Sequence, residues 1–201
     1  TTRVPFARWS DASLRDLTSS QARLRASYGA FCDASGFQVR AYGLRPAEAA
    51  SLDPQQRVFL DEAFSALSGA GYFSLDAAGH RRKVLGGRGF DDDLDFFRDD
   101  DERPLQGAKV GVCLGMMNVD AAFSIKPSEV GPHDLTGNGY AAAGSRLSFL
   151  FDLKGPNVVV DTACSSSLVA AHQAKAFLEN GDCEAALFGG CSLMLAPSFV
   201  H

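Results

Sequence analysis

The sequence predicts an α/β fold with a layered, parallel sheet. Short apolar runs bounded by glycine or proline, which are typical of buried strands, occur at 109–115, 156–161 and 184–196. A stretch with helical character separates the last two runs, so strand, helix and strand follow one another within about forty residues. This order indicates a βαβ unit, whose two strands we expect to be parallel and buried on both faces.

Composition is typical of a globular protein. The 201 residues are 46% hydrophobic and 21% charged, which is enough to bury a core. The net charge of −5 argues against nucleic acid or an anionic membrane as the main partner. No apolar run approaches the length of a membrane span, and the N-terminus lacks both a signal-peptide core and an initiator methionine. We therefore expect a piece of a longer cytoplasmic polypeptide, with an organelle as the alternative location.

The cysteines indicate a reducing compartment. They are odd in number, widely spaced and without a CxxC pair, which argues against a disulfide framework and against a zinc cluster. The five are Cys32, Cys113, Cys164, Cys183 and Cys191.

The first clear helix is predicted at 54–68. Asp53 can cap it, Pro54 suits its first position, and Gln56 stands where a capping box requires a glutamine or glutamate. Apolar residues then recur at helical spacing, and Gly69 can end the helix. Those apolar residues are Phe59, Ala63, Ala66 and Leu67.

Residues 79–106 interrupt the pattern and predict an exposed, charged insertion. A basic block around Arg81–Lys83 precedes an acidic block at 91–102, and the two could pair with each other or contact a partner. A solvated loop is the simpler interpretation. "GGRG" at 86–89 lacks the spacing and the Lys-Ser/Thr ending of a phosphate-binding loop.

The second half of the chain contains two further predicted helices. A helix of small residues begins after Gly139, although Gly144 weakens that prediction. Another runs from Cys164 to Glu179, with the pair Asn180-Gly181 as its stop signal. In the strand that follows, Gly189-Gly190 predicts a bulge or a close contact.

Cys164 stands where the second strand turns into that last helix. Backbone N–H groups at a helix N-terminus lack partners and carry the positive end of the helix dipole, so they favour a thiolate. Cysteines in such positions can have their pKa lowered from about 8.5 to roughly 3.5–7.5. The same amides can hold an oxyanion, and the small neighbouring residues leave room for an acyl chain. This pattern fits acyl transfer through a thioester.

The alternative is that Cys164 is a small buried core residue behind serines that are ordinary helix caps. The residues alone leave both interpretations open. Core or bystander roles are favoured for the other four cysteines. An α/β cysteine hydrolase is disfavoured, because its nucleophile elbow requires glycines where this chain has Thr162 and Ser166.

No histidine is a convincing base for Cys164. His172 is eight residues further on, about 12 Å along a helix axis, which is too far for direct proton transfer. His80 lies in the charged insertion, His133 lies in a turn-rich segment, and both are expected to face solvent; His201 is the last residue.

The sequence resembles the β-ketoacyl synthases, the condensing domains of polyketide synthases and animal-type fatty acid synthases. The resemblance rests on "LDPQQRVFLDEAFSALSGAGY", "TGNGYAAAGSRLSFLFDLKGPNVVVDTACSSS", "VDTACSSSLVA" and "ALFGGCSLMLAP". It covers nearly the whole chain except the charged insertion. Residues 1–201 correspond to about the N-terminal half of that domain.

The resemblance implies a thiolase-like α/β/α/β/α fold, of which this chain supplies the N-terminal half, and usually a homodimer. It implies that Cys164 takes an acyl group from the 4′-phosphopantetheine thioester of an acyl carrier protein, while a malonyl-type extender loses CO2 and attacks that acyl thioester. The Cys164 amide would contribute to the oxyanion hole. No bound cofactor and no metal are implied.

By the same resemblance, the two supporting histidines and the second oxyanion donor lie in the remaining half of the domain. The chain alone is therefore expected to be incomplete for condensation. A second hypothesis is a non-catalytic module that serves dimerisation or carrier-protein binding. The acyl substrate and the choice between polyketide and fatty acid synthesis are not readable from the residues.

Overall fold

The computed structural model describes residues 2–3, 28–29, 36–37, 39–70, 105–119, 121–122 and 130–195. Its elements are β1 (Thr2–Arg3), β2 (Tyr28–Gly29), η1 (Val39–Tyr42), α3 (Pro46–Ser51), α4 (Pro54–Gly69), β3 (Val110–Met116), α5 (Asp134–Asn138), α6 (Tyr140–Leu150), β4 (Asn157–Val160), α7 (Ser166–Glu179) and β5 (Ala185–Cys191). The charged insertion predicted at 79–106 lies outside the described residues, apart from its last two.

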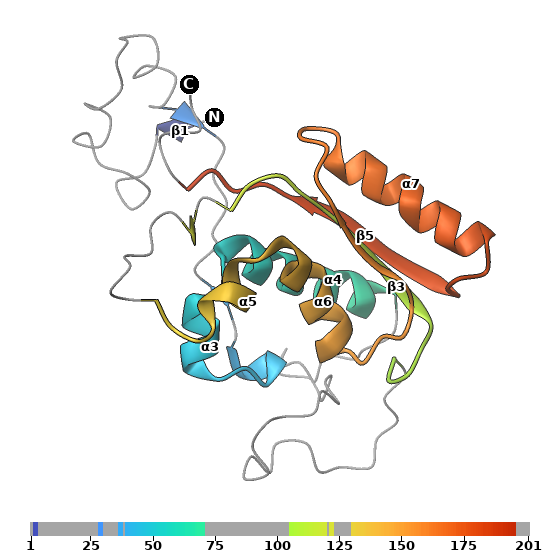
Figure 1. Ribbon diagram of the computed structural model, residues 1–201, viewed down its shortest axis with the longest axis horizontal. Coiled ribbons are helices and arrows are strands. Elements are labelled where there is room, and N and C mark those ends of the chain that lie inside the picture. The colour runs from blue at the N-terminus through green and yellow to red at the C-terminus, as the bar shows by residue number, and fades with distance from the viewer. Residues whose placement is uncertain are drawn as a thin grey trace.

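A three-stranded parallel sheet organises the fold. The strand order is β4-β3-β5. β3, the first of these three strands in the chain, therefore lies between the two strands of the βαβ unit. α7 covers one face, and α4 and α6 lie on the other (Figure 1). A separate two-stranded antiparallel ladder joins β1 to β2. The predicted parallel α/β architecture is confirmed.

The central strand β3 has one large and one small face. Val110, Val112, Leu114 and Met116 belong to the main core with α4 and α6. The alternating positions, Gly111, Cys113 and Gly115, face the other way. Cys113 packs there against Ala170 and Ala174 of α7. Successive side chains of a strand point to opposite faces, so these three small residues share the face under α7. Their size allows α7 to lie close to the sheet.

Burial on both faces was predicted for the strands of the βαβ unit, and this is wrong for β4 and β5. β3 is buried throughout, whereas β4 is half-buried and β5 is partly exposed. Both are edge strands within the described sheet. The outer side of α7 also leaves apolar side chains exposed, Leu168 at 75% and Leu178 at 44%.

Helix α4 matches the predicted position, but its start is built differently. The Asp53 carboxylate caps it by accepting from the backbone N–H of Gln55 at 2.8 Å, as predicted. The capping box is wrong, because the Gln56 side chain donates to the Gly137 carbonyl at 2.7 Å. That same carbonyl accepts from the Asp53 N–H at 2.9 Å, so a distant loop replaces the local reciprocal bond.

The glycine pair Gly189-Gly190 makes close contacts and is not a bulge, since both residues keep regular register with β3. A Cβ on Gly189 would meet the Phe59 ring at 3.1 Å. Gly144, which weakened the prediction of α6, has a similar role. A Cβ there would lie 2.8 Å from the Asn157 side chain, so the glycine lets α6 approach β4.

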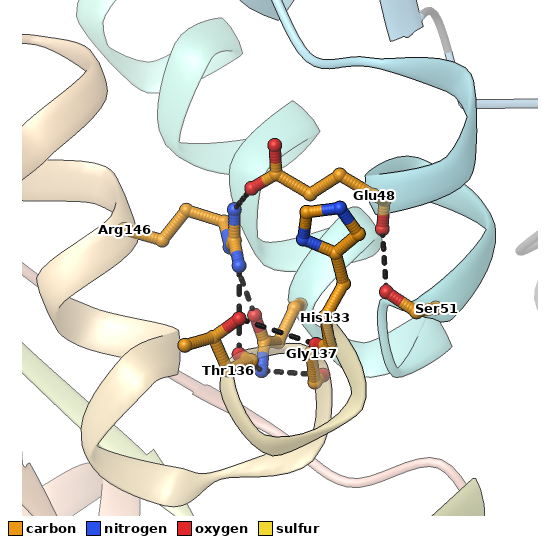
Figure 2. A network of polar contacts seen from close by, with 7 residues as sticks. Glu48, Ser51, His133, Thr136, Gly137 and Arg146 are labelled. Atoms are coloured by element: carbon orange, nitrogen blue, oxygen red, sulfur yellow. Dashed lines mark hydrogen bonds and ion pairs between the residues drawn. The ribbon is translucent and has the colours of Figure 1, made fainter. Parts of the chain in front are cut away.

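A polar network centred on Arg146 of α6 reaches α3, α4 and α5, and Figure 2 shows it from close by. The guanidinium of this α6 residue pairs with Glu48 of α3 and donates to the Gln56 side-chain oxygen of α4 at 3.3 Å. It also lies 3.5 Å from the Thr136 carbonyl of α5. The Arg146 side chain is only 9% exposed, so these partners replace water. The network fixes the helical layer behind the sheet.

We predict that Arg146→Met lowers the free energy of unfolding by about 2 kcal/mol, because Glu48 and the Gln56 oxygen lose a largely buried partner. Lys175→Met is the matched control. Its pair with Glu179 is more than 60% exposed on both sides, and its loss should cost about 0.5 kcal/mol or less. Urea denaturation of both variants measures the difference. Equal effects would contradict the structural role of the network.

Candidate functional site at the carboxyl edge of the sheet

Cys164 lies at the carboxyl edge of the parallel sheet, in the loop that leads from β4 to α7. The side chain is exposed on the described chain, so Cys164 is not a core residue there. The helix was predicted to begin at Cys164, but α7 begins two residues later, at Ser166. Cys164 therefore lies just before the first helical turn. In open parallel α/β sheets, ligands bind at this edge.

The residue before Cys164 has an unusual backbone. Ala163 has φ of 54°, in the left-handed region that non-glycine residues seldom adopt. Its N–H donates to the Asp161 carboxylate at 3.0 Å. Strained residues of this kind concentrate at functional sites, where the surrounding structure holds them. The strain marks the loop at 161–165 as a candidate site.

The serines after Cys164 are not ordinary helix caps. Ser165 occupies the N-cap position of α7 but makes no capping hydrogen bond. Its hydroxyl donates to the Thr162 carbonyl at 2.7 Å. The buried Ser166 hydroxyl accepts from the Thr162 N–H at 2.8 Å and donates to the Ala163 carbonyl at 2.6 Å. Both side chains thus fold back onto the loop that carries Cys164.

Two glycines set the position of the first turn of α7. Gly115 of β3 and Gly190 of β5 are neighbours in the parallel register. A Cβ on Gly115 would lie 2.5 Å from the carbonyl carbon of Ser166, and one on Gly190 would lie 2.6 Å from the Ser167 Cβ. The backbone after Cys164 therefore rests on the sheet at a distance that only glycine permits.

A polar clamp, made by the side chains of Gln55 and Asn118, lies at the ends of β3 and β5. Gln55 donates to the Asn118 carbonyl at 2.5 Å and accepts from the Leu193 N–H at 2.9 Å. Asn118 in turn donates to the Leu193 carbonyl at 3.0 Å. The clamp holds the segment after β5 against β3. Sequence reasoning missed it, because a fully buried glutamine in a first helical turn has no periodic signature.

The other described cysteines are poor candidates for a reactive site. Cys113 and Cys183 are buried, and Cys191 is half-buried. Burial raises the pKa of the Cys113 thiol, and the neighbouring Cys183 raises it further. Cys113, Cys164 and Cys183 are free thiols. Cys32 lies outside the described residues.

The structure brings neither described histidine to Cys164. His172 is exposed on α7, and His133 is half-buried at the N-cap of α5, where solvent exposure was predicted. His80 and His201 lie outside the described residues. Within the described ranges, no three residues among histidine, cysteine and the acids are grouped to hold a metal ion. No helix in that part of the chain is long and apolar enough to cross a membrane.

A family model described as the N-terminal domain of β-ketoacyl synthase matches residues 1–104 and 95–201. Among curated proteins, a hybrid PKS-NRPS synthetase of Emericella nidulans is 38% identical over 83% of this chain. A highly reducing polyketide synthase of Cryptosporiopsis is 37% identical over 82%. The aligned part is 4% and 6% of those proteins, so the chain spans a small fraction of the relatives it matches.

Solved structures give the same likeness. A ketosynthase from module 6 of the bacillaene synthase of Bacillus subtilis matches 98% of this chain with a TM-score of 0.70 and 30% identity. An oxazolomycin ketosynthase domain of Streptomyces albus matches 99% with a TM-score of 0.68 and 27% identity. The chain covers 27% and 31% of those two structures. The predicted thiolase-like class of fold is confirmed.

We predict that Gly115→Ala lowers the free energy of unfolding by about 3 kcal/mol, because its methyl group would overlap the backbone of Ser166. Gly69→Ala is the matched control. A Cβ there meets nothing within 4 Å, and alanine at this exposed helical position should be neutral or stabilising by up to about 1 kcal/mol. Chemical denaturation measures both. A Gly115→Ala variant as stable as the native chain would refute the close packing.

We also predict an order of alkylation by iodoacetamide in the folded chain. Cys164 reacts first because it is exposed, whereas burial protects Cys113 and Cys183, and the raised pKa of Cys113 further reduces its thiolate. Peptide mapping by mass spectrometry against time gives the order. The Cys164→Ala variant identifies the fast site by its loss. Equal rates at Cys164 and Cys113 without denaturant would contradict the geometry.

Proposed function

This chain belongs to the β-ketoacyl synthase family and matches the N-terminal domain of its polyketide synthase members, and on this basis we propose that Cys164 is the acyl-accepting nucleophile. The observation that carries the proposal is an exposed thiol at a strained, hydrogen-bonded turn, immediately before a helix N-terminus. The chain is then the acyl-accepting half of a β-ketoacyl-[acyl carrier protein] synthase, an acyltransferase. Residues 1–201 form its partial ketosynthase domain, with the charged insertion at about 79–106.

In the first step, the Cys164 thiolate attacks the carbonyl carbon of an acyl thioester. The 4′-phosphopantetheine thiolate of an acyl carrier protein leaves and takes up a proton, so one thioester replaces another. We assign stabilisation of the oxyanion of the tetrahedral intermediate to the Cys164 amide just before α7, with a second donor from the remaining half of the domain. A malonyl-type extender then loses CO2, and its carbanion attacks the acyl group on Cys164. The β-ketoacyl product forms, and the thiolate returns.

The local geometry supports acyl binding. The loop lies at the carboxyl edge of a parallel sheet, and its residues beside Cys164, Ala163 and Ser165, are small. No described histidine is bonded to Cys164, so proton transfer requires groups outside the described residues. We assign these groups to the remaining half of the domain, which would also cover the exposed apolar side chains of α7. A homodimer and a carrier protein complete the proposed set of partners.

A second candidate function is a non-catalytic module for dimerisation or carrier-protein binding. The lack of a described base beside Cys164 favours it. The two functions differ in one covalent bond, the thioester on Cys164.

We predict that incubation with an acyl-pantetheine thioester adds one acyl group to the chain, on Cys164. Intact-mass spectrometry measures the adduct, and peptide mapping assigns it. The Cys164→Ala variant should take no acyl group, whereas Cys191→Ala should behave as the native chain because Cys191 lies within β5. No adduct at native Cys164 in the folded chain would favour the non-catalytic module. An adduct that persists in Cys164→Ala would assign the nucleophile elsewhere.

A further inference from the structure

We propose that Ser166 is a positioning residue for Cys164. Its hydroxyl holds Ala163 in the left-handed conformation and thereby fixes how the next residue is presented. The inference rests on the proposed function for its catalytic consequence. It names a residue that acts through the backbone of the loop and does not touch the acyl group.

The Ser166 hydroxyl bonds to both sides of the strained residue. It accepts from the Thr162 N–H at 2.8 Å, just before Ala163, and donates to the carbonyl of Ala163 itself at 2.6 Å. Ser166 is 5% exposed, so water competes weakly for either bond. A left-handed alanine is unfavourable because its Cβ crowds the backbone, and the two bonds offset that cost.

The other side chains on the loop are less suited to this role. The Ser165 hydroxyl donates to Thr162 and makes no hydrogen bond to Ala163 within the described residues. Asp161 bonds to the Ala163 N–H but is exposed, so water can replace it. Neither side chain combines burial with bonds on both sides of the strained residue.

The backbone of Ser166 is itself held in place. Gly115 lets the sheet lie in close contact with the carbonyl carbon of Ser166. The N–H of Ser166 donates to the Ala163 carbonyl at 3.1 Å. The hydroxyl therefore extends from a rigid junction of helix and sheet to a loop that would otherwise relax. A nucleophile held this way keeps the orientation that fast acyl transfer requires, since small misplacements at a reacting atom are costly.

A double-mutant cycle tests the proposal, with Ser166→Ala measured in two backgrounds, the native chain and Ala163→Gly. Glycine adopts the left-handed conformation without steric cost, so the loop should then need the hydroxyl less. The rate of acyl transfer from an acyl-pantetheine thioester is the first readout. The rate of alkylation of Cys164 by iodoacetamide is the second, and hydrogen exchange of the Thr162 amide is the third.

With alanine at 163, Ser166→Ala should slow both reactions of Cys164 about fivefold, which is about 1 kcal/mol at 1.36 kcal/mol per tenfold. With glycine at 163, the loss should fall below about twofold. Exchange of the Thr162 amide should speed up in Ser166→Ala. Ser167→Ala is the matched control, because it removes a hydroxyl one residue further on that makes no hydrogen bond within the described residues.

Equal losses in both backgrounds, or no loss in either, would overturn the proposal, because Ser166 would then not act through Ala163. The readouts separate this failure from failure of the proposed function. If the native chain takes no acyl group while alkylation shows the background-dependent loss, the acyl-accepting function fails and the role of Ser166 stands. If acyl transfer occurs and the losses are equal, the function stands and the role of Ser166 fails.

Discussion

Gly115 and Gly190 lie side by side on adjacent parallel strands, directly beneath the first turn of α7. Because neither has a Cβ, the backbone of Ser166 rests against the sheet, and the helix N-terminus is fixed at the carboxyl edge. The loop at 161–165 must then span from the end of β4 to a point set by the sheet, and its tight path places Ala163 in a left-handed conformation.

The two faces of β3 separate structural from site-forming interactions. The large face packs Val112 and Leu114 against the helical layer, which the Arg146 network fixes through four helices. The small face has glycine and cysteine under α7, and its only buried helical partners among the described residues of α7 are Ser166, Ala170 and Ala174. The candidate site therefore lies over the face of β3 that has small side chains and close backbone contacts. The opposite face, packed densely against the helical layer, keeps the sheet rigid.

Sequence periodicity predicted the elements because their patterns are local. β3 and α4 lie within one residue of their predicted bounds, and α6 begins where it was predicted, directly after Gly139. The predictions that were wrong concern features that depend on distant parts of the chain. The Gly137 carbonyl, 81 residues from Gln56, displaced the local capping box. α7 starts at Ser166 and not at Cys164, because contact with the sheet and the serine hydroxyls hold the preceding residues out of the helix. Burial of β4 and β5 on both faces would require further packed elements, and the described residues do not supply them.

The same distinction bears on Cys164, which sequence alone left between a core residue and a nucleophile. A core cysteine gains stability by leaving water, as Cys113 and Cys183 do here. Cys164 gains nothing of this kind, since it is exposed. The residue before it is strained, and three neighbouring side chains, Asp161, Ser165 and Ser166, are hydrogen-bonded to hold the loop. That conformation and its hydrogen bonds support the proposal that this loop presents the Cys164 thiol to an acyl group.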